Sequence, residues 1–294
     1  MPLLLSLDVS KSEFCMAGFW GKLFENLSKN TFAGRVVTGL GAFVRGRFAS
    51  VPYVLGYIGC TFKSTFAFIN KEKAARKILI MQLLFTFIEA LPIIAFLSAA
   101  LGAAIFLFGY NIILSLGQAS IIYQILVVVV VRELGPVLVA FVVTARSSTA
   151  IATEIGGMVT SHQVESYISV GVDPVDYLVA PRFLGVTLSV FFLCLYFSLC
   201  GIVGPYVAAM FVNPSIAAGY FTELLKNFSL MMIFTSIVKS IVFGMIISIT
   251  ATYFGFNVER SSTEVPVAGI RAVSNSFVGI IIADVAITLV PSLL

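Results

Sequence analysis

The chain of 294 residues is 59% hydrophobic and only 11% charged, with a mean hydropathy of +1.05. A sequence with so few charged residues cannot cover the surface of a soluble globular protein, so it indicates an integral membrane protein. The net charge of +4 is unevenly distributed, because residues 1–77 carry a net +7 and the rest of the chain a net −3. We therefore expect the basic N-terminal end to lie on the cytoplasmic side of the membrane.

Cysteine and histidine usage argues against a disulfide framework or a metal site. The four cysteines are Cys15, Cys60, Cys194 and Cys200. None is spaced as Cys-x-x-Cys, and the chain has a single histidine. We interpret the cysteines as small buried hydrophobic residues and expect no metal site. Residues 1–10 are apolar but short and lack a basic start, so we do not interpret them as a cleaved signal peptide.

The N-terminal region, residues 1–77, is basic and aromatic. Lysines and arginines alternate with phenylalanines and Trp20, and no window in residues 11–70 stays free of charge over the roughly 20 residues that a spanning helix needs. We predict an amphipathic helix on the cytoplasmic leaflet, with aromatic side chains in the interface and basic side chains near lipid phosphates. An ordinary cytoplasmic extension is the alternative.

Five apolar stretches follow, and we predict that each crosses the membrane as a helix. Their ranges are 78–110, 121–144, 183–212, 230–254 and 271–293. The first exceeds one straight span, and Pro92 predicts a kink in it. The polar interval 145–182 is expected in the cytoplasm together with the N-terminus, which places the C-terminus outside. The predicted fold class is an all-α integral membrane protein.

Four ionisable residues fall inside the predicted spans, namely Arg132, Glu133, Lys239 and Asp284. Arg132 and Lys239 lie roughly 16 and 14 Å from the outer ends of their helices, and Asp284 lies about 12 Å from the outer face of the bilayer core. Their charges sum to zero, and an unpaired charge at the bilayer centre costs at least about 2.5 kcal/mol. We predict a polar cluster that joins the second, fourth and fifth spans and serves transport. The alternative is that its ion pairs only fix the helix register.

Successive side chains on a helix point in different directions, so Arg132 and Glu133 cannot easily satisfy each other alone, and we expect partners from other helices. Directly after them, Gly135 and Pro136 are expected to shape the second span. Glu89 is a fifth intramembrane acid, three residues before Pro92. It lines the same cavity or sits close enough to the surface to reach water, and the sequence favours neither position.

The polar interval 145–182 has the character of a docking segment. It carries Glu165, Asp173 and Asp176, and an exposed amphipathic helix there could sit in a groove on a soluble partner. Acids, bases and nucleophiles do not converge around His162, so we predict a non-catalytic protein. A nucleotide-binding loop of the form Gly-x-x-x-x-Gly-Lys-Ser/Thr is absent from the 294 residues. If ATP drives transport, another chain must bind it.

Two long motifs indicate a family. The segments RELGPVLVAFVVTARSSTAIATEIGGM (132–158) and GVDPVDYLVAPR (171–182) resemble the signature of the MlaE/YrbE permeases, the membrane subunits of Mla- and Mce-type lipid ABC transporters. The resemblance continues through Lys239 and Asp284 and covers roughly residues 78–294. A coincidental match over two such motifs is improbable.

The resemblance implies a homodimer with five spanning helices per subunit, an N-terminal interfacial helix and a cytoplasmic coupling helix. Two ATPase subunits would bind ATP and Mg²⁺, with no cofactor in this chain, and dock on the coupling segment, here roughly 154–176. The coupling residues would be Glu154, His162, Glu165, Asp173 and Asp176. A periplasmic MCE-domain protein would exchange phospholipid or a related lipid with the permease in the bacterial inner membrane. The family's membrane-buried charges correspond to the four named above.

The chain departs from the family pattern in the coupling segment, where the family more often has an acid at His162 and an Asp at Glu165. Two other functional classes remain open from the residues alone. One is an ion-coupled secondary carrier in which Glu133 and Asp284 take up protons, and the other is a membrane enzyme acting on lipid. The carrier predicts transport without nucleotide, whereas the enzyme predicts a modified product from the purified chain.

Overall fold

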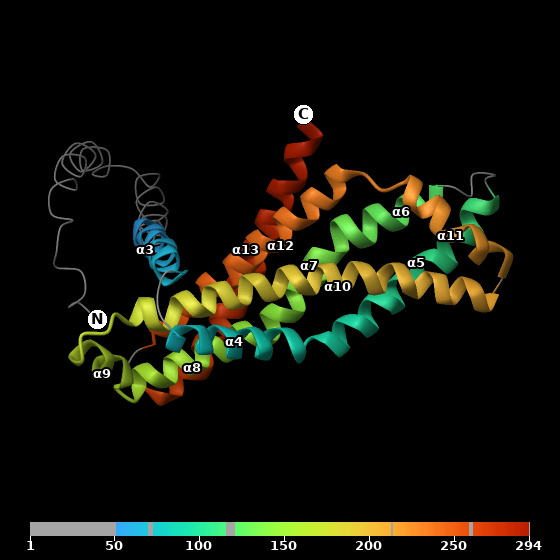
Figure 1. The fold of residues 1–294 in the computed structure, drawn as a ribbon. Helices are drawn as coiled ribbons and strands as arrows, with labels where there is room; N and C mark the ends of the chain where they lie inside the picture. The colour runs from blue at the N-terminus through green and yellow to red at the C-terminus, as the bar shows by residue number, and fades with distance from the viewer. Residues whose placement is uncertain (1–50, 70–72, 116–120, 213, 259–260, 294) are drawn as a thin grey trace, which may run out of the picture. The chain divides into compact units, whose positions relative to one another are not determined.

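The computed structural model describes residues 51–69, 73–115, 121–212, 214–258 and 261–293 (Figure 1). The chain divides into two units, residues 1–57 and 58–294. Most of the predicted N-terminal amphipathic region lies outside the described residues; its described parts are helix α3 (Val51–Ile69) and residues 73–77, which begin the next helix. Within the second unit, the ring of Phe62 on α3 packs edge-on against Phe183, with the ring centroids 5.4 Å apart.

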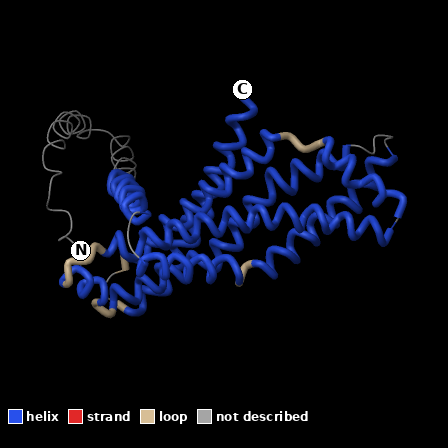
Figure 2. Tube along the Cα trace, in the orientation of Figure 1, coloured by secondary structure: helices blue, strands red, loops and turns tan. Residues whose placement is uncertain are grey.

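The described residues form helices joined by turns and short loops, and none of them forms a strand (Figure 2). Among them, five helical stretches are long and apolar enough to cross a membrane, which confirms the predicted fold class. They are Lys77–Tyr110, Ile121–Thr160, Val175–Phe211, Leu230–Phe256 and Ser262–Leu289, here called spans one to five. Helices suit this setting because each satisfies its own backbone hydrogen bonds where no water can.

The first span is broken where the sequence predicts a kink. Helix α4 (Lys73–Ile88) ends in a turn at residues 89–90, and helix α5 (Leu91–Ser115) begins directly after it. Pro92 is the second residue of α5, where its missing N–H removes no hydrogen bond from the helix interior. The break leaves a change of direction beside Glu89.

The second span is one helical stretch whose winding changes along its length. Its segments are α6 (Ile121–Leu126), the π-helix η1 (Val127–Leu134), α7 (Gly135–Val143), the π-helix η2 (Thr144–Ser148) and α8 (Thr149–Thr160). The prediction that this helix ends at residue 144 is therefore wrong. Hydroxyl groups are accommodated because they donate to their own helix, as Thr149 does to Ala145 O (3.0 Å) and Thr153 to Thr149 O (2.9 Å).

Spans three and five also begin earlier than predicted. Span three starts with the π-helix η3 (Val175–Val179) and continues as α10 (Ala180–Val212), and span five is η4 (Ser262–Glu264) followed by α13 (Val265–Leu293). Asp173 caps span three, because its Oδ1 accepts a hydrogen bond from the Val175 N–H at 2.8 Å. The helices of spans two and three are joined by residues 161–174, which contain the short helix α9 (Gln163–Ser169).

The connection between spans three and four holds a helix that the sequence analysis missed. Helix α11 (Pro214–Lys226) occupies most of the interval between the predicted third and fourth spans, for which no helix was expected. Tyr220 anchors it, because its side chain is fully buried and its hydroxyl donates to Ile202 O at 2.9 Å. Burial raises the pKa of Tyr220 above its ordinary value, so the phenol stays a neutral donor.

Helix α10 lies at the centre of the packing. It contacts α4, α5 and α12 (Leu230–Phe256), and α12 also packs against α8 and α13 (Figure 1). Glycine allows two of these close approaches. A Cβ atom added at Gly204 of α10 would lie 2.6 Å from Ala99 O on α5, and one at Gly244 of α12 would lie 2.7 Å from the Thr187 Cα.

The described cysteines are free thiols. Cys194 is buried as expected, with its Sγ 3.5 Å from Ser236 Oγ, and Cys200 is partly buried. Cys60 is exposed, so the interpretation of a buried small residue is wrong there, because α3 leaves that face uncovered. Cys15 lies outside the described residues.

Candidate functional site

Lys239 of α12 is the centre of an ion-pair cluster between three spans. Its side chain is 0% exposed, and its Nζ lies 2.5 Å from Glu133 Oε2 on span two and 2.8 Å from Asp284 Oδ1 on span five. Thr288 adds a hydroxyl that donates to Glu133 Oε2 at 3.4 Å. A buried ammonium group requires such partners, because desolvating it alone is very costly.

Arg132 joins this cluster through its own neighbour. Arg132 Nε lies 3.0 Å from Glu133 Oε1, and Glu133 also has the expected partner on another helix, Lys239. Arg132 and Glu133 both lie in the π-helix η1, whose wider turn reduces the angle between successive side chains. The structure therefore brings all four predicted intramembrane charges together, and their sum is zero.

Pro136 and Gly135 account for the local winding at the cluster. Proline has no N–H to donate to the carbonyl group four residues earlier, which here belongs to Arg132. The Gly135 N–H instead donates to Val130 O, five residues back, as in a π-helix. A Cβ atom at Gly135 would lie 2.7 Å from that same oxygen, so the position requires glycine. π-Helical turns of this kind often occur at functional sites.

The cluster has a buried end and an accessible end. Lys239 is fully enclosed, whereas the side chains of Arg132, Glu133 and Asp284 keep 25%, 30% and 27% exposure. The accessible groups carry one positive and two negative charges beside the apolar walls of the spans. This arrangement can stabilise the helix contacts and present charge to a polar group that moves past it.

Glu89 belongs to a different pair. Its carboxylate contacts the guanidinium of Arg146 on η2, and Arg146 Nη2 also donates to Phe85 O at 3.2 Å. The Arg146 guanidinium lies 5.2 Å from the centre of the Phe85 ring. Arg146 thus braces the break between α4 and α5, a role that the sequence analysis missed. The available signal was that Arg146 is the only charged residue between Glu133 and Glu154.

The predicted coupling residues surround the turn between α8 and α9. His162 adopts a left-handed conformation (φ 58°) at the start of α9, and its Nδ1 lies 3.0 Å from Glu165 Oε2. Both side chains are exposed, as is Asp173, while Asp176 lies in η3. His162 is thus a solvated turn residue rather than part of a helix. The acids together give an exposed, negatively charged connection.

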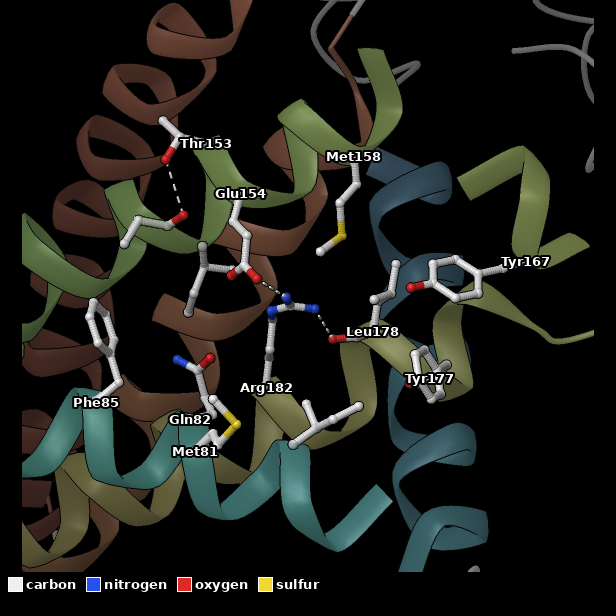
Figure 3. A pocket seen from close by; sticks show the side chains of 13 residues that line it. Met81, Gln82, Phe85, Thr153, Glu154, Met158, Tyr167, Tyr177, Leu178 and Arg182 are labelled. Carbon is white, nitrogen blue, oxygen red and sulfur yellow. Dashed lines mark hydrogen bonds and ion pairs between the residues drawn. The ribbon is translucent and has the colours of Figure 1, made fainter. Parts of the chain in front are cut away.

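Glu154 points elsewhere, toward span three. Its Oε1 lies 2.8 Å from Arg182 Nη2, and Arg182 Nη1 donates to Leu178 O at 2.9 Å (Figure 3). Arg182 is almost completely buried. It closes the motif GVDPVDYLVAPR (171–182), but the sequence analysis assigned it no role. This pair joins the end of span two to the start of span three.

These features define a multi-pass helical membrane protein with a charged cluster between its spans and an acidic connection at one end. The Permease MlaE family model matches residues 79–290. The chain belongs to the MlaE permease family, as its motifs predict.

Curated relatives agree with this assignment. A probable ABC transporter permease protein of Rickettsia typhi is 31% identical over 220 residues, which cover 75% of this chain and 85% of the relative. The intermembrane phospholipid transport system permease protein MlaE of Haemophilus influenzae is 24% identical over 213 residues, or 72% of this chain and 81% of that protein. The chloroplastic protein trigalactosyldiacylglycerol 1 of Arabidopsis thaliana is 33% identical over 159 residues, or 52% of this chain and 44% of that protein.

Family membership fixes the coarse function. The chain is the permease of an ABC transporter, a non-catalytic membrane subunit that works with an ATPase partner. The alternatives of an ion-coupled carrier and of a membrane enzyme are accordingly set aside.

Proposed function

We propose that this permease moves phospholipid or a related lipid between the inner membrane and a periplasmic MCE-domain carrier. The names of two relatives support a lipid substrate, since one belongs to a phospholipid transport system and the other is named after a glycolipid. A part in maintaining outer-membrane lipid asymmetry would follow from that traffic.

The observation that carries the proposal is the Lys239 cluster. A permease for an amphipathic lipid must offer an apolar path and still accommodate a charged head group. The cluster supplies partly exposed charges on the walls of apolar spans, with net charge zero and a buried lysine that holds three spans together. Movement of these spans would change both the helix contacts and the charges offered to the head group.

The acidic connection is the proposed contact for the ATPase. Residues 161–174 with α9 project exposed Glu165 and Asp173 beyond the ends of spans two and three. Two ATPase subunits would dock on two copies of this connection, and ATP and Mg²⁺ would bind to them, with no cofactor in the permease. Glu154 and Asp176 would stiffen the connection from the membrane side.

Topology and assembly follow from the charge distribution and the exposed helix faces. The basic N-terminal region supports a cytoplasmic N-terminus, and with five spans the C-terminus would lie in the periplasm. Span five carries exposed Val278, Ile282 and Val285, an apolar face suited to lipid or to a second copy in a homodimer.

Purification of the chain with its ATPase from native membrane tests this function. Mass spectrometry should identify phospholipid or a related lipid in the preparation, and ATP should drive transfer of a labelled phospholipid from proteoliposomes to an acceptor MCE-domain protein. Equal transfer with and without nucleotide would contradict the proposal, as would a preparation that moves only water-soluble solutes.

A further inference from the structure

A second polar site lies away from the Lys239 cluster, in a pocket between α4, α8 and the start of span three (Figure 3). The pocket has a volume of about 690 Å³, within the range of pockets that hold small molecules. Its polar centre is the pair of Glu154 and Arg182, and neither residue contacts the cluster charges in the ion pairs described above.

The ion pair in the pocket is half buried and half open. Arg182 is only 4% exposed, and its Nε is buried with no hydrogen-bond partner among the described residues. Glu154, by contrast, keeps 51% of its side chain exposed. The pair therefore offers an accessible carboxylate, while its guanidinium retains a donor that the protein leaves unused. Buried donors of this kind normally find a partner.

Two tyrosines complete the polar side. The rings of Tyr167 and Tyr177 lie with their centroids 5.3 Å apart, and Figure 3 shows the Tyr167 hydroxyl directed toward the pocket. Adjacent aromatic rings attract an ammonium group through their faces, and phenol hydroxyls can donate to a phosphate oxygen. The polar side can thus receive either sign of charge.

Another part of the pocket lining is apolar and reaches the exposed surface of span one. Met81 and Phe85 of α4 line the pocket and are also 62% and 41% exposed, and Met158 of α8 adds an apolar wall. The pocket therefore combines a polar centre with an apolar wall that is open at the surface of span one. A phospholipid has the same two parts, a charged head group and apolar acyl chains.

We propose that this pocket binds the head group of a zwitterionic phospholipid, with its ammonium on Glu154 and the tyrosines and its phosphate near Arg182. The neutral ion pair favours a ligand with both charges over a net anionic one, because each ligand charge meets its opposite. Acyl chains would leave along Met81 and Phe85. This site goes beyond the proposed function, which does not require it.

Tryptophan fluorescence provides a direct test, since the chain has a single tryptophan. The full chain carrying Trp20→Phe and Phe85→Trp is reconstituted, alone and with its ATPase, in bilayers of phosphatidylglycerol containing increasing brominated phosphatidylethanolamine, whose bromine quenches nearby tryptophan. We expect phosphatidylethanolamine to bind about five-fold more tightly than phosphatidylglycerol at this reporter. A Phe96→Trp reporter, on an exposed face of α5, should show equal binding of the two lipids.

Two further variants test the residues. Glu154→Gln should abolish the preference at the Phe85→Trp reporter. Met158→Phe should do so by filling the pocket without altering the ion pair, whereas Met210→Phe, at an exposed methionine elsewhere, should leave it intact. Equal binding of both lipids in the parent, or an unchanged preference in Glu154→Gln and Met158→Phe, would overturn the site.

The assay separates this site from the proposed function. Quenching seen with the chain alone but lost on adding the ATPase would assign the pocket to ATPase docking and overturn the lipid site. If ATP-driven lipid transfer is normal but the Phe85→Trp reporter shows no head-group preference, only the proposed lipid site is wrong. If the reporter shows the preference but no lipid is transferred, only the proposed function is wrong.

Discussion

Lys239 holds three spans because its fully buried ammonium has two carboxylate partners on different helices. Replacing it with methionine keeps an unbranched side chain of similar length but removes the cation that Glu133 and Asp284 share, which leaves Arg132 as the only cation of the cluster. We expect Lys239→Met to lower the free energy of unfolding by about 3 kcal/mol, because breaking a buried pair leaves unpaired charge. Denaturant titration in detergent would measure this loss.

Lys226 provides the matched control for Lys239. It pairs with Glu223 on the exposed surface of α11, with Nζ 2.7 Å from Glu223 Oε1. Lys226→Met should change the free energy of unfolding by less than about 1 kcal/mol, as for other surface pairs. Equal losses in the two variants would contradict the special position of Lys239.

The four cluster residues could be predicted from the sequence because charge is rare within apolar spans and must be neutralised there. Their partners could be expected only in outline. Arg146 and Arg182 escaped prediction of a role because each lies in a stretch that reads as polar, and only the packing against α4 and α8 reveals their partners. The pairing of Arg132 with Glu133 depends on a π-helix, which hydrophobic periodicity does not show.

At the level of helices, the contact of α5 with α10 depends on glycine. A methyl group at Gly204 would collide with the backbone of Ala99, which cannot move as a flexible side chain can. We expect Gly204→Ala to lower the free energy of unfolding by about 1 to 3 kcal/mol, the usual cost of overpacking. Thermal unfolding in detergent would measure the change.

Gly219 gives the opposite expectation in the same assay. It is exposed within α11, and a Cβ atom there would meet nothing within 4 Å. Gly219→Ala should stabilise the chain, by up to about 1 kcal/mol, because alanine is the better helix former. A loss of stability at both glycines would show that the close approach of α5 and α10 is not the cause.

Helix existence was predictable from the sequence, whereas helix ends were not. Apolar length identifies five spans because the bilayer requires it. Polarity was a poor guide to the end of span two, since Thr149 and Thr153 satisfy their hydroxyls within the helix. Helix α11 was missed because Tyr220, its anchor, is buried by neighbours distant in the sequence.

For the whole transporter, the acidic connection should set the affinity for the ATPase. Glu165 is 60% exposed beside the start of α9. Glu165→Arg should weaken ATPase binding by about five-fold or more, mainly through slower association, because charge at an interface rim steers encounter. Surface plasmon resonance with the purified ATPase would measure it. Glu223→Arg on α11, at the other end of the spans, should leave ATPase binding unchanged.

The central claim is that the Lys239 cluster serves lipid movement and does more than fix helix register. Glu133→Gln combined with Lys239→Gln removes one charge of each sign, so the remaining Arg132 and Asp284 still balance. The decisive measurement is ATP-driven transfer of labelled phospholipid by the reconstituted complex with this double variant. The account predicts that transfer is lost while assembly and ATPase docking persist; transfer at the parent rate would contradict it.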